Sequence, residues 1–252
     1  MSDEFTLSYP HDAVALIQQN VKNVSSEGFQ LKKMLIDAVK NNEQAKVLVI
    51  TGTGKFYSRG GDKQGMLDII SRKTTFNTTA AYGGAHNLYF DFPLPIITAM
   101  QGHAFGAGFN EGFYGEILIL SEISVYAASF MKHGFTPGVG STFLLPYYLG
   151  HALGWEMLFT ANDYTGKDLR NRGVTVQVVK QDIVLSTAMK MALELAKMPK
   201  LSLQLLKKSR VLRIKEGIMK AIELELSMHE ETMGTPAALK GVMELFENLN
   251  EQ

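Results

Sequence analysis

Short apolar runs that stop at a glycine recur through the first part of the chain, and they limit the folds open to it. Lys46–Thr51 stops at Gly52, and Pro95–Met100 is followed by Gly102. Runs of this length, bounded by such breakers, are typical of buried strands. We expect further strands over the segments Ala13–Ile17, Ile117–Leu120 and Ile123–Ala127.

Helical spacing of apolar residues is present once in this part and dominates the rest. Phe29–Val39 has its apolar residues three and four positions apart, as in an amphipathic helix. Beyond about residue 180 we expect only helices, over the segments Val184–Lys197, Ser202–Leu212, Glu216–Glu231 and Ala237–Asn248. Strands alternating with helices, followed by helices alone, predict an α/β core over residues 1–182 and a helical C-terminal region over residues 183–252.

Composition narrows the classes of function. The 252 residues include 25 basic and 25 acidic ones, and this zero balance does not favour nucleic-acid binding, which needs a basic surplus. The lack of cysteine excludes disulfides and thiolate chemistry. Met1–Pro10 is polar and unlike a signal peptide, and no apolar stretch approaches the roughly 20 residues of a membrane helix. We expect a cytoplasmic protein without a metal site, because no His, Asp or Glu cluster has ligand spacing.

Two glycine-rich loops are the candidates for chemistry. Phe56–Asp62 (FYSRGGD) comes shortly after the first strand named above, and Gly102–Asn110 (GHAFGAGFN) follows the second. Glycine lets the main chain approach a ligand closely and aim its N–H groups at an anion. Two converging N–H groups would make an oxyanion hole for a thioester enolate. Neither loop has a nucleotide-binding fingerprint, and a purely structural role for both stays open at this point.

Three motifs together resemble the crotonase (enoyl-CoA hydratase/isomerase) superfamily. They are VLVITGTGKFYSRGGD at 47–62, PIITAMQGHAFGAG at 95–108 and GFTPGVGST at 134–142, in the family's order and spacing. The resemblance covers nearly the whole chain and implies an α/β fold, a crotonase-type spiral of ββα units with a helical C-terminal trimerisation region. It also implies a pantetheine thioester substrate. The thioester oxygen would lie between the N–H groups of Gly61 and Ala107, beside Gly60 and Gly106.

The sequence departs from a hydratase of this superfamily at two positions. The resemblance places the two acid–base glutamates of a hydratase at Asn110 and Phe130. An amide does not exchange a proton at neutral pH, and a phenyl ring has none to give. Glu111 is adjacent, but one helical step turns it about 100° away. We therefore do not expect hydration, and we assign Asn110 and Phe130 to substrate binding.

Longer stretches are similar to a narrower group, the hydratase-like decarboxylases of polyketide β-branching cassettes. The stretches are AMQGHAFGAGF, VYAASFMKHGFTPGVGSTF and ELSMHEET. The resemblance implies a glutaconyl-type thioester carried on the phosphopantetheine of an acyl carrier protein, with no further cofactor. Loss of the distal carboxylate would give a dienolate, stabilised by the oxyanion hole and then protonated. It also implies a homo-oligomer, a trimer or a dimer of trimers.

The same resemblance implies a histidine on a C-terminal helix and a lysine after the first glycine loop. His229 matches the histidine, and Glu225, one turn earlier, would orient it and favour its charged form; an interfacial histidine is the alternative. Thr75 occupies the place of the lysine, and Lys73 lies two residues earlier. Either a loop brings Lys73 inward, or the general acid is missing. In the second case we expect protonation at Cα and a β,γ-unsaturated exomethylene product.

Arg59 and His133 complete the set of candidate substrate-binding residues. Arg59 would meet the substrate carboxylate or point to solvent, and His133 lies beside the third motif, where a direct catalytic role is the alternative. His103 would contact the thioester or pack locally. The segment Lys207–Lys215 has five basic residues among nine, which form either a solvated face or a docking surface for an acidic carrier protein.

Two other functions remain open on the sequence. One is an enoyl-thioester isomerase, which would move a double bond through the same dienolate. The other is a crotonase-fold binding partner without activity, which the absent glutamates and lysine both permit.

Overall fold

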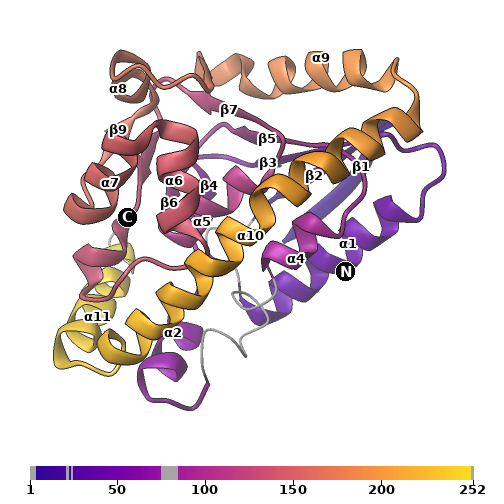
Figure 1. The fold of residues 1–252 in the computed structure, drawn as a ribbon. Helices are drawn as coiled ribbons and strands as arrows, with labels where there is room; N and C mark the ends of the chain where they lie inside the picture. Colours follow the sequence, from indigo (N-terminus) through magenta and orange to yellow (C-terminus); the bar gives the residue numbers. More distant parts are fainter. Residues whose placement is uncertain (1–3, 21–22, 24, 75–84, 251–252) are drawn as a thin grey trace.

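A six-stranded sheet forms the centre of the molecule (Figure 1). The structure is a computed structural model that describes residues 4–20, 23, 25–74 and 85–250. The strands follow the order β1-β2-β3-β5-β7-β10, and only the β1–β2 pair is antiparallel. Their bounds are Phe5–His11 (β1), Val14–Gln19 (β2), Val47–Gly52 (β3), Ile96–Met100 (β5), Ile117–Ser121 (β7) and Gln177–Val179 (β10).

Strands of the first sheet are followed in the chain by strands of a second, four-stranded sheet. Its order is β4-β6-β8-β9, with the bounds Phe56–Ser58, His103–Phe105, Val125–Ala127 and Tyr164–Thr165. Thus β3 leads into β4, β5 into β6 and β7 into β8, and the small-sheet strands of these three pairs run parallel. This repeated passage between two sheets confirms the spiral of ββα units that the motifs implied.

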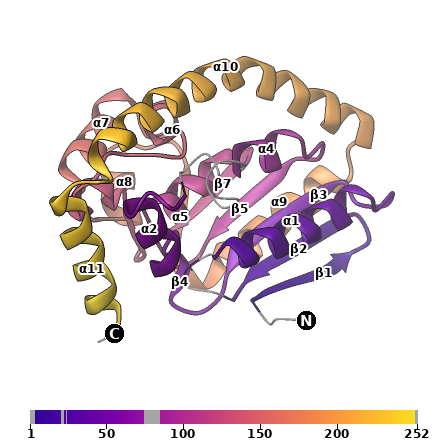
Figure 2. The same cartoon turned by 90° about the horizontal axis from the view of Figure 1, so that it is seen from below.

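The helices fall on both sides of the large sheet. Their bounds are Ser26–Lys40 (α1), Lys63–Ile70 (α2), Ala85–Phe90 (α4), Ala107–Glu111 (α5), Ser141–Leu149 (α6), His151–Thr160 (α7), Gly166–Asn171 (α8), Val184–Ala196 (α9), Lys200–Thr232 (α10) and Pro236–Asn250 (α11). Short 3₁₀ helices span Gly112–Tyr114, Ser129–His133 and Gln181–Ile183. One side of the sheet packs against α9, and the core on the other side includes residues of α1, α4 and α10. Helix α10 crosses the molecule in both views (Figures 1 and 2).

Alternation along the strands explains this division. In β3, Val47 and Val49 pack against α9, whereas Leu48 and Ile50 belong to the larger core on the opposite face. Successive side chains of a strand point to opposite faces, so a run that is apolar throughout needs cover on both. The larger core continues into the C-terminal helices through Val211, Ile218 and Val242. The hydrophobic core therefore does not end at residue 182.

Three sequence predictions need correction. Phe5–His11 forms a strand (β1), although the polar N-terminal stretch did not predict one. The strand predicted over Ile123–Ala127 is shorter, Val125–Ala127. The two helices predicted around residues 202–231 are one helix of 33 residues, α10. Gly217 lies within this helix, and a side chain at this position would overlap the Phe143 ring that packs there.

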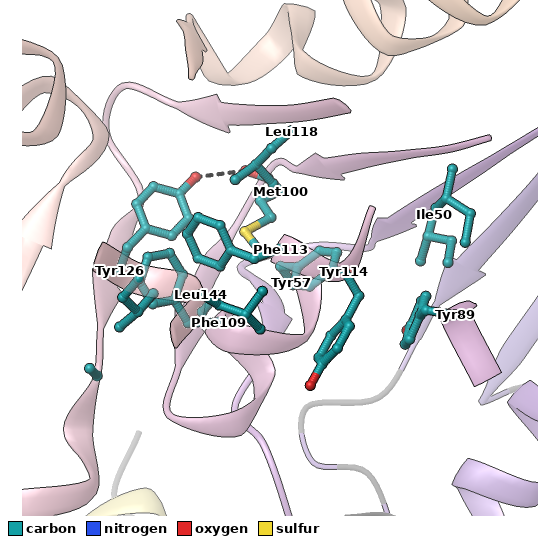
Figure 3. Close-up of a cluster of buried hydrophobic side chains, with 14 of the residues drawn as sticks. Ile50, Tyr57, Tyr89, Met100, Phe109, Phe113, Tyr114, Leu118, Tyr126 and Leu144 are labelled. Carbon is teal, nitrogen blue, oxygen red and sulfur yellow. Dashed lines mark hydrogen bonds between the residues drawn. The ribbon is translucent and has the colours of Figure 1, made fainter. Parts of the chain in front are cut away.

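A cluster of aromatic side chains fixes the helix that follows the second glycine loop (Figure 3). Phe109 and Phe113 meet edge to face at 5.0 Å between ring centroids, and Phe109 also packs against Tyr126. The Tyr126 hydroxyl donates to the carbonyl of Met100 at 2.7 Å, at the end of β5. Buried aromatic rings of this kind contribute a large apolar area with few rotatable bonds. The cluster thus holds α5, and with it Ala107, against the strands.

Candidate functional site

One pocket collects most of the predicted site residues. Its described lining includes the predicted residues Arg59, Gly60, Gly61, Gly106, Ala107, Phe130 and His133. It is completed by Met66, Ser129, Phe135, Gly138, Val139 and Leu245. The pocket has a cavity volume of about 50 Å³ and opens to solvent. Residues from both glycine loops, the third motif and α11 therefore meet at one place, while Thr75 lies outside the described residues.

The two glycine loops touch through their main chains. A Cβ at Gly108 would lie 2.8 Å from the amide nitrogen of Gly60 and would overlap the side chain of Ser58. A Cβ at Gly60, whose φ is +85°, would lie 3.6 Å from the amide nitrogen of Ala107. At position 108 only glycine leaves room for this approach. At position 60 only glycine adopts this φ without strain. The sequence pattern of small residues thus has a direct packing cause.

Hydrogen bonds fix the orientation of these loops. The side chain of Asn23 donates to the carbonyl of Gly61 at 2.9 Å, and the side chain of Asp62 caps α2 through the amide of Gly65 at 3.1 Å. The amide of Gly106 donates to the carbonyl of Ala127 at 2.9 Å. Among the residues that the structure describes, the N–H groups of Gly61 and Ala107 have no acceptor. Both residues border the pocket, and Gly61 is part of a β-bridge.

Arg59 is the charged side chain among the described lining residues. Its guanidinium lies over the Phe56 ring, 3.9 Å from the centroid, which is the stacking that arginine favours. Its Nε is buried without a hydrogen-bond partner in the described part of the chain, and burial lowers the pKa of Arg59. The Phe56 ring holds the guanidinium in place at the pocket, where it could bind an anionic group of a ligand.

His229 lies behind the pocket wall and is neutral. Its ring contacts Gly138 and packs edge-on against Phe135, both of which line the pocket. Its Nε2 lies 2.7 Å from the carbonyl oxygen of Thr136, so this nitrogen carries the proton of the neutral ring. Burial lowers the pKa of His229 to about 4. The predicted charged imidazolium is therefore wrong.

The carboxylate of Glu225, predicted to orient His229, is engaged elsewhere. It accepts hydrogen bonds from the amide of Gly140 at 2.7 Å and from the amide and hydroxyl of Thr142 at 2.8 and 2.7 Å. It thereby satisfies N–H groups at the start of α6, which have no partner within that helix. The cause is the position of Glu225 in α10, where it faces the loop before α6 as His229 does one turn later.

Asn110 also lies behind the wall, outside the described lining. Its side-chain amide donates to the carbonyl of Val139, which accepts a second hydrogen bond from the hydroxyl of Tyr114 at 2.9 Å. The expected substrate contact of Asn110 is thus replaced by a contact to the loop that lines the pocket. Glu111 is turned away as predicted, because its carboxylate binds the buried ammonium of Lys32 at 2.8 Å and the hydroxyl of Tyr89 at 2.6 Å.

The remaining candidate histidines and Lys73 have clear positions. His133 lines the pocket, and burial lowers its pKa. His103 accepts a hydrogen bond on Nδ1 from the amide of Val125 at 2.8 Å, which favours local packing over thioester contact. The ammonium of Lys73 is exposed and lies 3.6 Å from the carboxylate of Asp68, away from the pocket lining. Lys73 is therefore not brought inward.

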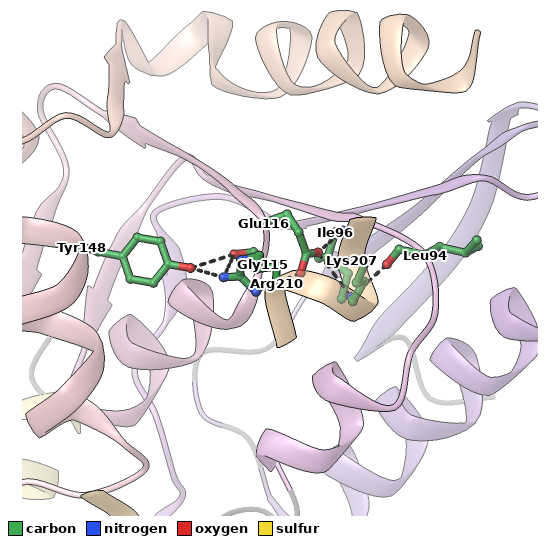
Figure 4. Close-up of polar contacts among 7 residues, drawn as sticks. All are labelled: Leu94, Ile96, Gly115, Glu116, Tyr148, Lys207 and Arg210. Carbon is green, nitrogen blue, oxygen red and sulfur yellow. Dashed lines mark hydrogen bonds and ion pairs between the residues drawn. The ribbon is translucent and has the colours of Figure 1, made fainter. Parts of the chain in front are cut away.

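The basic segment Lys207–Lys215 does not form one docking surface. Lys207 and Arg210 point inward and bind the carboxylate of Glu116 at 3.2 and 3.0 Å (Figure 4). Lys207 also donates to the carbonyl of Leu94 at 2.9 Å, and burial lowers its pKa to about 8. These contacts attach α10 to the sheet. Lys208 and Arg213 remain exposed.

Sequence reasoning missed several lining residues, of which Ser129 is the most polar. Its hydroxyl oxygen would lie 3.4 Å from a Cβ at Gly106, directly beside the second glycine loop. The only sequence signal was its place next to Phe130. Leu245 was missed because its helix, α11, reaches the pocket only through the tertiary fold. Met66 follows from the helix that Asp62 caps, a pattern visible in the sequence.

The described residues contain neither a membrane-spanning helix nor a cluster suited to a metal ion. None of their helices combines the length and apolar character needed to cross a membrane. They also contain no group of three or more His, Asp or Glu side chains arranged to hold a metal ion.

Comparison with known proteins agrees with this geometry. The chain is 41% identical over 214 residues to the bacillaene synthase decarboxylase PksI of Bacillus subtilis, which covers 84% of each chain. A solved structure from a dehydratase/decarboxylase enzyme couple involved in polyketide β-branching superposes with a TM-score of 0.91 at 34% identity, covering 97% of this chain and 99% of the other.

A second solved structure is the ECH2 decarboxylase domain of CurF from Lyngbya majuscula. It superposes with a TM-score of 0.86 at 31% identity, covering 96% of this chain and 99% of that domain. The sequence profile described as Enoyl-CoA hydratase/isomerase matches residues 13–252. The chain belongs to the enoyl-CoA hydratase/isomerase family.

Proposed function

We propose that this protein decarboxylates a branched glutaconyl-type thioester, carried on an acyl carrier protein, in polyketide β-branching. The observation that supports it most is the meeting of two glycine loops at one pocket. In addition, the two positions where a hydratase would have its acid–base glutamates are Asn110 and Phe130 in this sequence. Decarboxylation needs a polarised thioester and a proton, but no pair of glutamates. The similarity to PksI and to the ECH2 domain of CurF, both described as decarboxylases, supports the same reaction.

The reaction follows from the electron flow. The thioester oxygen accepts hydrogen bonds from the N–H groups of Gly61 and Ala107, which become stronger as negative charge develops on it. The bond between the γ-carbon and the distal carboxylate breaks, its electron pair enters the conjugated thioester, and CO₂ leaves. The dienolate then takes one proton. The electron sink is the substrate's own thioester, so the proposal needs no resident cofactor beyond the phosphopantetheine arm.

Arg59 and the apolar lining have separate parts in this proposal. The guanidinium of Arg59, stacked on Phe56, positions the distal carboxylate by a charge-assisted hydrogen bond. Met66, Phe130 and Phe135 surround the pocket with apolar surface, which suits the uncharged CO₂ better than the carboxylate. His229 remains a proposed site residue. In its neutral form it fixes the wall at Gly138 and Thr136 and acts on the substrate through that wall.

The position of the final proton is also a proposal. Protonation of the γ-carbon gives an α,β-unsaturated product with a β-methyl group, whereas protonation at Cα gives a β,γ-unsaturated exomethylene. Thr75 stands where related decarboxylases are expected to have lysine, and Lys73 faces solvent. We therefore favour the exomethylene product.

A synthetic 3-methylglutaconyl-carrier thioester tests the function. We expect the wild type to release CO₂, and NMR of the product to show the exomethylene. Thr75→Lys should shift the double bond toward the α,β position. Double-bond movement without CO₂ release would indicate an isomerase instead, and binding without turnover would indicate an inactive crotonase-fold partner. Identical product regiochemistry in both proteins would contradict the assignment of Thr75.

We also propose that the chain assembles as a trimer or a dimer of trimers. In support, α10 exposes a stripe of large apolar side chains, with Leu205, Leu212 and Met219 spaced seven residues apart. Leu205 is 57% and Leu212 69% exposed in the single chain. An apolar stripe of this size on a soluble helix marks an association surface.

A further inference from the structure

Val139 occupies a backbone conformation that a β-branched residue rarely adopts. Its φ is +55°, in the left-handed region, and Gly140 after it has a φ of +78°. For valine this region is sterically unfavourable, whereas glycine adopts it freely. A residue stays in such a conformation only where the surrounding contacts fix it. The contacts around Val139 therefore indicate what the conformation achieves.

A single peptide group carries these contacts. Its carbonyl, from Val139, accepts hydrogen bonds from the side-chain amide of Asn110 at 2.5 Å and from the hydroxyl of Tyr114 at 2.9 Å. Its N–H, from Gly140, donates to the carboxylate of Glu225 at 2.7 Å. Asn110, Tyr114 and Glu225 are all at most 2% exposed. Two opposite sides of the fold thus clamp one peptide plane between them.

The clamp fixes the Val139 side chain at the pocket. Val139 lines the pocket together with Ala107 and Phe130. Asn110 lies in the same short helix as Ala107, less than one turn away, so the clamp sets Val139 relative to the amide proposed to bind the thioester oxygen. A β-carbon substituent begins three bonds beyond the thioester carbonyl carbon. It therefore reaches the wall beside Ala107.

We propose that Val139 is a specificity-determining residue that limits the size of the β-branch, and that Asn110, Tyr114 and Glu225 position it. This inference rests on the proposed function, since it assigns a substrate preference to the same pocket. Glycine at position 139 would relieve the backbone strain at this φ and would remove the side chain from the pocket wall. Valine in the strained conformation instead adds a branched side chain to the pocket lining.

Binding of saturated analogues tests the inference independently of turnover. The probes are 3-methylpentanoyl-pantetheine and 3-ethylpentanoyl-pantetheine, whose branches differ by one methylene, with dissociation constants measured by calorimetry. We expect the wild type to bind the methyl-branched probe more tightly. Val139→Gly should reduce this preference by about tenfold, the effect of one methylene in a closed pocket. Val139→Leu should increase it.

Two further variants test the role of Val139 separately from the positioning role of Asn110. Ala161→Gly replaces another residue of positive φ, +50°, at the end of α7 and outside the pocket lining, and it should keep the wild-type preference. Asn110→Ala should reduce the preference in the wild-type background. In a Val139→Gly background it should change nothing more, because the side chain that it positions is gone.

An unchanged preference in Val139→Gly would overturn the inference. An equal effect of Asn110→Ala in both backgrounds would overturn the positioning role of Asn110. Release of CO₂ from the 3-methylglutaconyl-carrier thioester by the wild type is measured in parallel. If the branch preference depends on Val139 but no CO₂ is released, the decarboxylase function is refuted and the role of Val139 is supported. If CO₂ is released but the preference does not depend on Val139, the decarboxylase function is supported and the role of Val139 is refuted.

Discussion

Among single residues, burial rather than charge sets the state of the imidazoles near the pocket. Burial lowers the pKa of both His133 and His229, and for His229 the value is about 4. Neither ring is therefore positively charged at neutral pH. Among the described residues, neither of these two rings is therefore an imidazolium donor for the proton that the proposed dienolate takes up.

The pKa of His229 predicts a pH dependence of stability. Its folded value, about 4, lies below the ordinary 6.5, so the unfolded chain binds a proton first as the pH falls. The stabilisation is complete above about pH 6.5 and is lost as the pH falls toward 4. Between pH 7 and 4 we expect the unfolding free energy of the wild type to fall by about 2–3 kcal/mol more than that of His229→Gln. Urea titrations at several pH values measure this, and parallel curves would contradict it.

Ser129 gives a second prediction at this scale. Its hydroxyl lies beside Gly106 in the pocket lining, and no hydrogen bond of the described residues uses it. We expect Ser129→Ala to lower kcat/KM by roughly tenfold, the effect of one hydrogen bond, with an unchanged melting temperature. Ser186→Ala, at an exposed serine of α9, is the matched control. Equal kcat/KM values of Ser129→Ala and Ser186→Ala would contradict a role of the Ser129 hydroxyl in the reaction.

At the scale of elements, one carboxylate attaches the longest helix to the central sheet. Glu116 binds Lys207 and Arg210 of α10 and accepts a hydrogen bond from the amide of Ile96 at 2.8 Å (Figure 4). Lys207 is 3% exposed, so its charge depends on this partner. The network aligns α10, and with it Glu225 and His229, against the pocket loop.

Removal of this carboxylate should be strongly destabilising. Glu116→Gln leaves the ammonium of Lys207 buried without a counter-charge, and we expect a loss of about 3–5 kcal/mol in chemical denaturation. The control is Glu194→Gln, which breaks the exposed ion pair with Lys197 and should lose less than about 0.5 kcal/mol. A similar small loss in both variants would show that the network does not hold α10.

The elements also show where sequence reasoning works and where it stops. Periodicity located the buried strand at Lys46–Thr51 to within one residue, because a strand that is apolar on both faces has few alternatives. It missed β1, an edge strand whose residues are mostly exposed and polar. The glycine loops were recognised by motif. Ser129 and Val139 stand inside the quoted motifs, but no local pattern marked them or Leu245 as pocket residues, since a residue joins the pocket through tertiary contacts.

For the whole molecule, the exposed face of α10 predicts the oligomeric state. We expect Leu212→Glu to convert the assembly to a monomer in analytical ultracentrifugation, because the charge would be buried between chains. Met34→Glu, on α1, replaces a side chain of similar exposure (66% against 69%) and should keep the assembly intact. A monomeric wild type, or an unaffected mass for Leu212→Glu, would contradict the proposed interface.

The wall contributed by Leu245 affects how the protein matures. The second glycine loop is complete at Ala107, but Leu245 is synthesised 245 − 107 = 138 residues later. At roughly 5–20 residues per second, translation separates the two by on the order of ten seconds. The chain therefore lacks this part of the pocket wall until α11 has been synthesised. A chain truncated before α11 would leave this side of the pocket open.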